Sequence, residues 1–453
     1  MNRLRNLYAL AARRPRWWFY PLAVLLLVSW LDRVWLLLQA GGPFRVVGID
    51  WTMYASQALV LRAGEPQWMY DLGHIESYLQ TLAVYTTNPA EPLSVGPVPY
   101  VPVFAWLMIP FTMVPPIPGL MLWTALNLIA LAWLAYRVSR EVPGLQPLQA
   151  LLALLVSFPM AIGLIAAQPT AILGCAVAEW YLAMRSDRDF KAGLWLAVLL
   201  LKPQYGVLIA PVLIWKRRWN MVLGVLCGGV AILVTSLLVG GMPALSAYAS
   251  SVAASSDWGG SALASPGQMI NWRALILNLR PSIGPTSGLL LVLVAGFLSA
   301  AAALVVWRAA WAAQSWTLAP RVAVLALTTV LVSYHSHSHG LALFALPVAA
   351  SLGEPRLRRV TRTAILALLF LPSLIIITGQ HWLWREVIQH QPVDVLIWSP
   401  LVQILLMVAI GCLLRDVLSP KPEAIAAEIH PARQLVPNPA PRLVASHQPS
   451  VPE

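Results

Sequence analysis

Charged and sulfur-containing residues are scarce in this sequence of 453 residues. Only 11% of the residues are charged and 59% are hydrophobic, and the mean hydropathy is +0.71. A soluble globule needs more polar surface than this, so we expect the chain to lie in a lipid bilayer. The three cysteines, Cys175, Cys227 and Cys412, fall inside apolar segments and form neither a disulfide framework nor a CxxC metal motif.

Several sequence motifs of well-known enzyme classes are also absent. The sequence has no P-loop, no GxGxxG after a strand and no HExxH, so ATP-driven pumping, dinucleotide chemistry and zinc proteolysis have no support. The net charge of +12 would in a soluble domain suggest a nucleic acid partner, but the basic residues stand in short clusters between apolar runs. That pattern is the topological signal of membrane insertion, and it predicts no nucleic acid partner.

Apolar segments recur along the chain and predict about twelve transmembrane helices. They lie at 17–39, 119–136, 147–167, 169–184, 192–201, 205–215, 221–239, 286–307, 322–332, 340–353, 363–379 and 395–414. The expected fold is therefore an all-α polytopic membrane protein. It has a basic cytoplasmic N-terminus at 1–16, a transmembrane domain at 17–415 and a proline-rich, disordered cytoplasmic tail at 416–453.

A further apolar stretch, Tyr100 to Val114, is broken by Pro102 and Pro110, and charge decides whether it crosses. If it does not cross and the N-terminus is cytoplasmic, 23 of the 30 basic residues lie on the cytoplasmic side; if it crosses, only 9 do. The positive-inside rule favours the first arrangement. We therefore expect the stretch to lie along or dip into the outer leaflet, both termini to be cytoplasmic, and long outer loops at 40–118 and 240–285.

The first outer loop is rich in aromatic residues and predicts amphipathic helices that rest at the membrane interface. These aromatic residues are Trp51, Tyr54, Trp68, Tyr70, Tyr78 and Tyr85.

Two pairs of apolar segments are unusually short. The segments 192–201 and 205–215 each cover about half of a hydrocarbon core roughly 30 Å thick, so Lys202 at the tip of this hairpin should lie below the membrane surface. The pair 322–332 and 340–353 has a polar tip that contains His335, His337 and His339. Irregular polar backbone at this depth is tolerated only where it lines a cavity.

Three groups of polar residues carry possible chemistry. Asp50 suits a general base that deprotonates an acceptor hydroxyl, or it simply caps a helix that starts at Trp51. Lys202 needs an anionic partner such as a lipid phosphate, unless it snorkels to the interface. Histidines spaced by two on an irregular tip should project to different sides, which disfavours a three-histidine metal site and favours donation to a phosphate.

Weaker signals come from polar residues in the outward turns. Gln168 marks the turn between two helices, and Asn271 and Arg273 lie in the second outer loop. Together with Tyr54 and Gln204 they are our candidates for substrate binding.

The spacing of these motifs resembles glycosyltransferase family 87. The first matching motif is an outer loop with an early Asp and Tyr. A proline-rich entry and a Gln-x-Asn-like turn come next. They are followed by an Ala-Gly to Lys-Pro hairpin and a late polar tip. The matching residues are Asp50, Tyr54, Gly64, Tyr70-Asp71, Tyr100-Val101-Pro102, Pro110, Gln168-Pro169-Thr170, Ala192-Gly193, Leu201-Lys202-Pro203 and His335 to His339 with Pro347.

The resemblance implies an inverting mannosyltransferase of the GT-C superfamily. Its donor would be a polyprenyl-phosphate mannose and its acceptor a lipid or glycan, on the outer face of a bacterial plasma membrane and among membrane lipids. Asp50 would be the catalytic base, and Lys202 with His335 and His337 would hold the departing phosphate. No metal or cofactor is then required, because the lipid-linked sugar itself is the substrate.

Two departures leave the acceptor and the sugar open. Val101 interrupts the usual Tyr-Pro-Pro, and Pro169-Thr170 replaces the usual residues after Gln168. The alternatives are a transporter or lipid flippase, which also uses broken helices and intramembrane charge, and a non-catalytic membrane scaffold. A transporter usually shows two similar halves, whereas this sequence shows one asymmetric arrangement.

Overall fold

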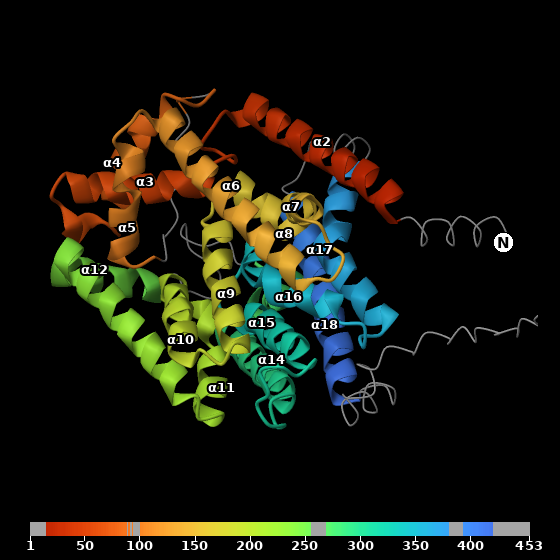
Figure 1. The fold of residues 1–453 in the computed structure, drawn as a ribbon. Coiled ribbons are helices and arrows are strands. Elements are labelled where there is room, and N and C mark those ends of the chain that lie inside the picture. The colour runs from red at the N-terminus through yellow and green to blue at the C-terminus, as the bar shows by residue number, and fades with distance from the viewer. Residues whose placement is uncertain are drawn as a thin grey trace, which may run out of the picture.

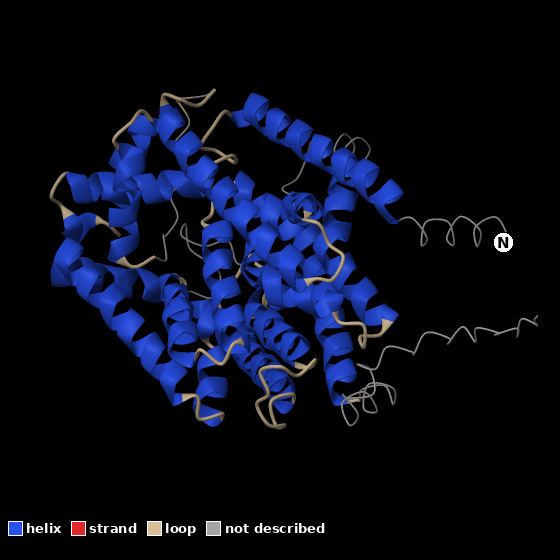
Figure 2. Ribbon diagram, in the orientation of Figure 1, coloured by secondary structure: helices blue, strands red, loops and turns tan. Residues whose placement is uncertain are grey.

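The described part of the chain is helical. The computed structural model describes residues 15–87, 89–90, 93, 100–254, 269–379 and 393–419. Within these residues Figure 2 shows helices and loops, and the β-pairing found there is one isolated bridge between Pro43 and Val47. Most of the expected basic N-terminus (1–14), part of the second outer loop (255–268) and the tail from residue 420 lie outside the described residues.

Six helices of the described residues are long and apolar enough to cross a membrane, and a bent pair makes a seventh possible span. The six are α2 (Pro15–Gly41), α6 (Pro116–Glu141), α12 (Trp219–Ala254), α14 (Pro285–Val305), α17 (Arg359–Gly379) and α18 (Val393–Leu418), and the pair is α7 (Pro147–Val156) with α8 (Phe158–Ile165), bent by 70°. The chain is therefore a multi-pass, all-α membrane protein (Figure 1).

The other predicted segments fold into shorter helices, so the described residues give six or seven candidate spans and not clearly twelve. A single helix needs about 20 residues to cross a bilayer, and these helices do not reach that length. They are α9 (Thr170–Arg185), α10 (Asp189–Ala197) with η3 (Val198–Leu201), η4 (Pro203–Gly206) with α11 (Ile209–Trp215), α15 (Leu318–Val332), and η6 (Ser338–Phe344) with α16 (Ala345–Gly353). The hairpin that carries Lys202 is thus built from half-length pieces, as its short segments predict.

The first outer loop is a packed helical unit. It contains α3 (Ile49–Arg62), η1 (Pro66–Trp68), α4 (Leu72–Ala83), α5 (Pro102–Met108) and η2 (Ile109–Thr112), and Figure 1 shows α3, α4 and α5 together beside one end of α12. Trp51 and Tyr54 of α3 are buried within this unit, where α3 packs on α4, α5 and η2. The expected position of these helices at the membrane interface stays a prediction. The proline-broken stretch from Tyr100 becomes α5 and η2, which together are too short to cross.

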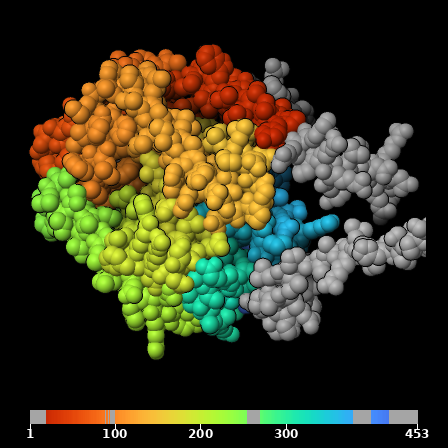
Figure 3. All heavy atoms as spheres, in the orientation of Figure 1, coloured from red at the N-terminus to blue at the C-terminus, as the bar shows by residue number. Residues whose placement is uncertain are grey.

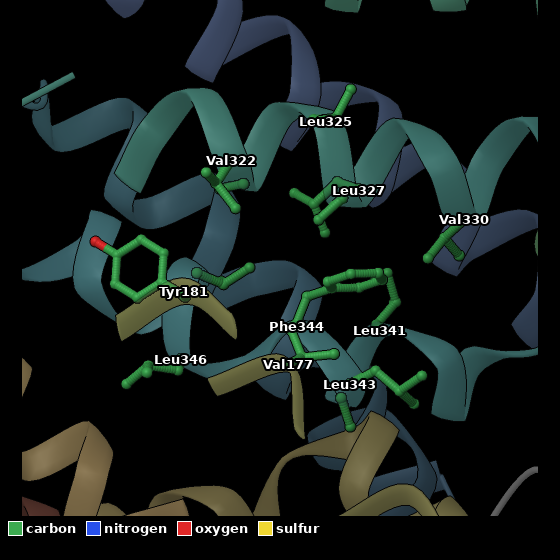
Figure 4. Packing of buried hydrophobic residues seen from close by; sticks show 14 of the residues in the cluster. Val177, Tyr181, Val322, Leu325, Leu327, Val330, Leu341, Leu343, Phe344 and Leu346 are labelled. Atoms are coloured by element: carbon green, nitrogen blue, oxygen red, sulfur yellow. The ribbon is translucent and has the colours of Figure 1, made fainter. Parts of the chain in front are cut away.

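A large apolar core joins α9 and α15 through the chain that follows the histidine tip, which packs on both helices. Figure 4 shows Val177 and Tyr181 of α9 facing this core, with Val322 and Val330 of α15 and Phe344 of η6. All five side chains are buried. Because η6 begins at Ser338, this packing fixes the polar tip relative to α9.

Glycines set the contact between α10 and α12. A Cβ atom on Gly193 would lie 2.1 Å from the carbonyl oxygen of Met221 and 2.8 Å from Cα of Gly224. The two helix backbones therefore touch, which is the packing that small residues allow between membrane helices. Since α10 leads directly into η3 and Lys202, this contact also sets the position of the hairpin tip.

Gly193→Leu should force α10 away from α12 and destabilise the protein by about 1–3 kcal/mol, the usual cost of an overfilled packed site. The matched control is Gly296→Leu, because Gly296 lies within α14 and a Cβ atom on it would meet no neighbouring atom within 4 Å. Thermal unfolding of the two purified variants in the same detergent measures the difference. Equal melting temperatures would contradict the close backbone contact.

Candidate active site

The N-terminus of α3 is joined to the C-terminus of α8. The last carbonyls of a helix lack partners within the helix. Here the backbone N–H of Gly48 donates to the carbonyl of Ile165 at 2.7 Å, and that of Asp50 donates to Ala166 at 3.0 Å. Gly48 has φ 80°, a left-handed conformation that suits glycine. The junction therefore places Asp50 beside the turn that carries Gln168.

Asp50 lies in the first turn of α3, after the N-cap residue Gly48, so the capping alternative is wrong. Its Oδ2 accepts a hydrogen bond of 2.6 Å from Nε2 of Gln168, 118 residues away in sequence. The carboxylate of Asp50 and the turn that carries Gln168, which are far apart in the sequence, thus come together in the structure.

Gln168 links Asp50 to Lys202. The amide oxygen of Gln168 accepts a hydrogen bond of 2.7 Å from Nζ of Lys202 and one of 3.2 Å from the hydroxyl of Tyr100. Lys202 is 4% exposed, and its Nζ is 5.0 Å from the centre of the Tyr100 ring. The carboxylate and the ammonium therefore do not pair directly, because one amide group lies between them.

Tyr100 is a site residue to which sequence reasoning gave no role, although its Tyr-Val-Pro motif was part of the family resemblance. Its ring stacks on Phe104, with centroids 4.1 Å apart, and meets Tyr54 edge-on at 5.3 Å. Tyr54 is buried and lies one helical turn after Asp50, where it supports Tyr100. Its predicted contact with substrate stays a prediction.

The turn before Gln168 is held by a third helix. Ala167 has φ 60°, an uncommon conformation for a residue with a side chain. The indole N–H of Trp123 on α6 donates to its carbonyl at 2.7 Å. This hydrogen bond and the two bonds from α3 fix the direction in which the Gln168 side chain leaves the turn.

The three histidines of the tip lie in a row, so the expectation that they project to different sides is wrong. Ring centroids are 5.1 Å apart for His335 and His337 and 5.7 Å apart for His337 and His339. His337 has extended backbone (φ −109°, ψ 167°), and the 3-10 helix η6, which contains His339, begins directly after it at Ser338. No three metal-ligating side chains among the described residues gather around one point.

The histidine that meets the lysine is His339, which was not among the two histidines predicted to hold phosphate. Its Nε2 is 3.4 Å from Nζ of Lys202. His335 lies farther along the row, and its buried Nδ1 has no hydrogen-bond partner among the described residues. Burial, the neighbouring His337 and the positive charges of Lys202 and Arg273 lower the pKa of His335 to about 3, so its ring is neutral.

The predicted second outer loop also contacts the histidine tip. Asn271 caps α13 (Trp272–Leu279) through the backbone N–H of Ala274, and its Nδ2 donates to the carbonyl of Tyr334 at 2.9 Å. The guanidinium carbon of Arg273, a fully buried residue, lies 4.4 Å from the centre of the Tyr334 ring. Asn271 thus positions the tip, and Arg273 adds a cation near His335.

Gln204 is the predicted substrate-binding residue that this network does not include. It lies in η4 next to the hairpin tip and is partly exposed, and it makes none of the hydrogen bonds that join Asp50, Gln168 and Lys202.

Asp50 is the titratable carboxylate of this network. Burial raises its pKa above the ordinary aspartate value, while the hydrogen bond from Gln168 and the charge of Lys202 act in the opposite direction. A carboxylate with a raised pKa is a stronger base than an exposed one. The arrangement can therefore accept a proton at Asp50 and stabilise negative charge near Lys202.

Comparison with known proteins identifies the family of the chain. The sequence profile of glycosyltransferase family 87 matches residues 99–333, which is slightly more than half of the chain. No curated protein sequence matches. The matched part contains Tyr100, Gln168 and Lys202, whereas Asp50 and His339 lie outside it. With this match and its membrane-spanning helices, the chain belongs to glycosyltransferase family 87 and is a membrane glycosyltransferase.

Proposed function

We propose that this glycosyltransferase is an inverting enzyme of the GT-C type that moves mannose from a polyprenyl phosphate to a lipid or glycan acceptor. The observation that carries the proposal is the chain of contacts from Asp50 through Gln168 and Lys202 to His339. It holds a base and a buried cation at a fixed separation without neutralising either. Transfer from a lipid phosphate needs these two groups.

The base acts on the acceptor. Asp50 takes the proton of the acceptor hydroxyl as the acceptor oxygen forms its bond to the anomeric carbon of the sugar. Gln168 keeps one carboxylate oxygen occupied and fixes the orientation of the group, because its amide is itself held by Lys202 and Tyr100. Attack opposite to the departing phosphate inverts the configuration at that carbon.

The cation acts on the leaving group. As the bond between the anomeric carbon and the phosphate oxygen breaks, the electron pair stays with the polyprenyl phosphate and its negative charge grows. Lys202 supplies a fixed positive charge for that phosphate, and the neutral tip histidines can donate hydrogen bonds in the appropriate tautomer. Arg273 lies on the other side of the tip and adds to the positive potential there.

Transfer assays with purified protein test this proposal directly. Labelled polyprenyl-phosphate mannose should pass its sugar to one member of a panel of membrane glycolipids, whereas GDP-mannose in its place should give no product. Product formed from the nucleotide sugar alone would contradict the proposed donor. Polyprenyl phosphates that carry glucose or arabinose, run in parallel, identify the sugar.

The site is proposed to open on the outer face of a bacterial plasma membrane. Support comes from the basic residues at the opposite helix ends, such as Arg140 in the last turn of α6 and Lys216 directly after α11. An impermeant thiol reagent added to intact cells should label Val84→Cys, next to α4, and should leave Ser186→Cys, next to α9, unlabelled. Both positions are exposed in the structure. The reverse labelling would place the site on the cytoplasmic face.

A further inference from the structure

A groove of about 480 Å³ lies between α6, α9 and α10, away from the active site. It is lined by Trp133 and Arg137 of α6, Cys175 and Glu179 of α9, and Trp195 of α10. Figures 1 and 3 show α6 and α10 on the near side of the molecule. Cys175 follows Gln168 by seven residues, so the groove begins about 10 Å farther along α9 than the active site.

The groove combines an apolar wall with two opposite charges. Nη2 of Arg137 lies 2.8 Å from Oε1 of Glu179, and the two side chains are 30% and 13% exposed. Nε of Arg137 is buried and has no hydrogen-bond partner among the described residues. Trp133 and Trp195 flank the pair, and both indoles are more than one-third exposed. A ligand here meets a cation, an anion and two aromatic rings within one recess.

The groove also lies at the depth of lipid headgroups. Arg137 is four residues from the end of α6 and Glu179 is six from the end of α9, which places the pair about 6–9 Å from these helix ends. Arg140, Arg185 and Arg188 stand at the same ends. Tryptophan and basic side chains are enriched at this level of a membrane protein, where lipid phosphates are found.

We infer that this groove binds the headgroup of a phosphoethanolamine lipid. Its phosphate would meet the exposed part of the Arg137 guanidinium, and its ammonium group would meet the carboxylate of Glu179. The Arg137–Glu179 ion pair has no net charge, so it complements a zwitterionic headgroup better than an anionic one. The acyl chain would continue along the apolar wall between the two tryptophans.

Two other occupants fit the charges less well. A prenyl chain offers nothing to the ion pair, and the helix of a partner protein would have to bury the pair, which costs free energy. A headgroup supplies a counter-charge to each member and leaves both at the wet level of the bilayer.

The test compares two ion pairs on the same two helices. Arg137→Gln/Glu179→Gln removes the pair in the groove, and Glu141→Gln/Arg185→Gln removes the neighbouring pair, which also joins α6 to α9 but does not line the groove. Each purified protein is equilibrated with phosphatidylethanolamine or phosphatidylglycerol of equal chain length. Native mass spectrometry then counts the bound lipids.

The unchanged protein and the Glu141/Arg185 variant should retain phosphatidylethanolamine about tenfold more strongly than phosphatidylglycerol. The Arg137/Glu179 variant should lose that tenfold preference, which corresponds to about 1.4 kcal/mol. The inference would be overturned if the Arg137/Glu179 variant and the Glu141/Arg185 variant retained phosphatidylethanolamine equally. It would also be overturned if the unchanged protein showed no preference between the two lipids. Displacement of the lipid by polyprenyl phosphate would also overturn it and assign the groove to a prenyl chain.

A second variant keeps the test decisive if the Arg137/Glu179 variant does not fold. Cys175→Phe fills the groove from α9 and leaves both charged residues in place. It should abolish retention of phosphatidylethanolamine, whereas Cys227→Phe, on the exposed surface of α12, should leave it unchanged. If Cys175→Phe retained as much phosphatidylethanolamine as Cys227→Phe, the lipid would bind outside this groove.

Discussion

Asp50→Asn should reduce sugar transfer by about 10²–10⁴-fold, the usual contribution of a positioned general base. Asparagine has nearly the same shape and can still accept the hydrogen bond from Gln168, but it cannot take a proton from the acceptor. The measurement is the rate of transfer from polyprenyl-phosphate mannose, with protein abundance and melting temperature determined in parallel. The melting temperature at neutral pH should not fall, since burial penalises the charge that the substitution removes.

Asp71→Asn is the matched control for this prediction. Asp71 is the N-cap of α4 and accepts from the backbone N–H of His74, a role that asparagine also fills. Its transfer rate should therefore equal that of the unchanged protein. If Asp50→Asn kept its activity as well, Asp50 would not be the base.

The pH profile gives a second measurement of the same residue. A base works only when it is deprotonated, so kcat/KM should fall as the pH drops through the pKa of Asp50. Because burial raises that pKa, the acidic limb should lie above the range of an exposed aspartate. The residual activity of Asp50→Asn should lack this limb.

The sequence predicts which residues form this site better than it predicts the contacts between them. Asp50, Gln168 and Lys202 are all predicted, because each is a polar residue at a turn that the sequence places at one end of the helical bundle. The structure joins Asp50 to Gln168 across a sequence separation of 118 residues and Gln168 to Lys202 across one of 34. The positions of these residues in turns do not predict that the amide group of Gln168 alone connects Asp50 to Lys202.

The roles of Tyr100 and His339 do not follow from the sequence, because they depend on contacts between residues far apart in the chain. Tyr100 has a hydrogen bond to Gln168 across 68 residues and a cation contact with Lys202, and neither follows from a local pattern. The choice of His339 over its neighbours depends on the local backbone, because His337 is extended whereas His339 lies inside η6, where it meets Lys202. The structure does not clearly give the twelve predicted spans, because several apolar segments that were each counted as one span fold into helices too short to cross a bilayer alone, such as α11 and α15.

Lys202→Met should reduce transfer by about 10²–10³-fold, the range found when one donor to a developing negative charge is removed. Methionine keeps the length and the apolar stem of the lysine, and Gln168 keeps its hydrogen bond from Tyr100, so the loss reports the charge itself. The effect should appear mainly in kcat, because the charge on the phosphate grows in the transition state. Lys191→Met, on the exposed start of the same hairpin, should leave the rate unchanged.

A change of donor separates a role in leaving-group departure from a structural role. If Lys202 stabilises the departing phosphate, a donor whose lipid alcohol is fluorinated, and whose phosphate is therefore a weaker base, should depend less on the lysine. The ratio of rates between the unchanged protein and Lys202→Met should then shrink with the fluorinated donor. A lysine that only braces Gln168 and His339 would give the same ratio with both donors, because its contribution would not depend on the charge of the leaving group.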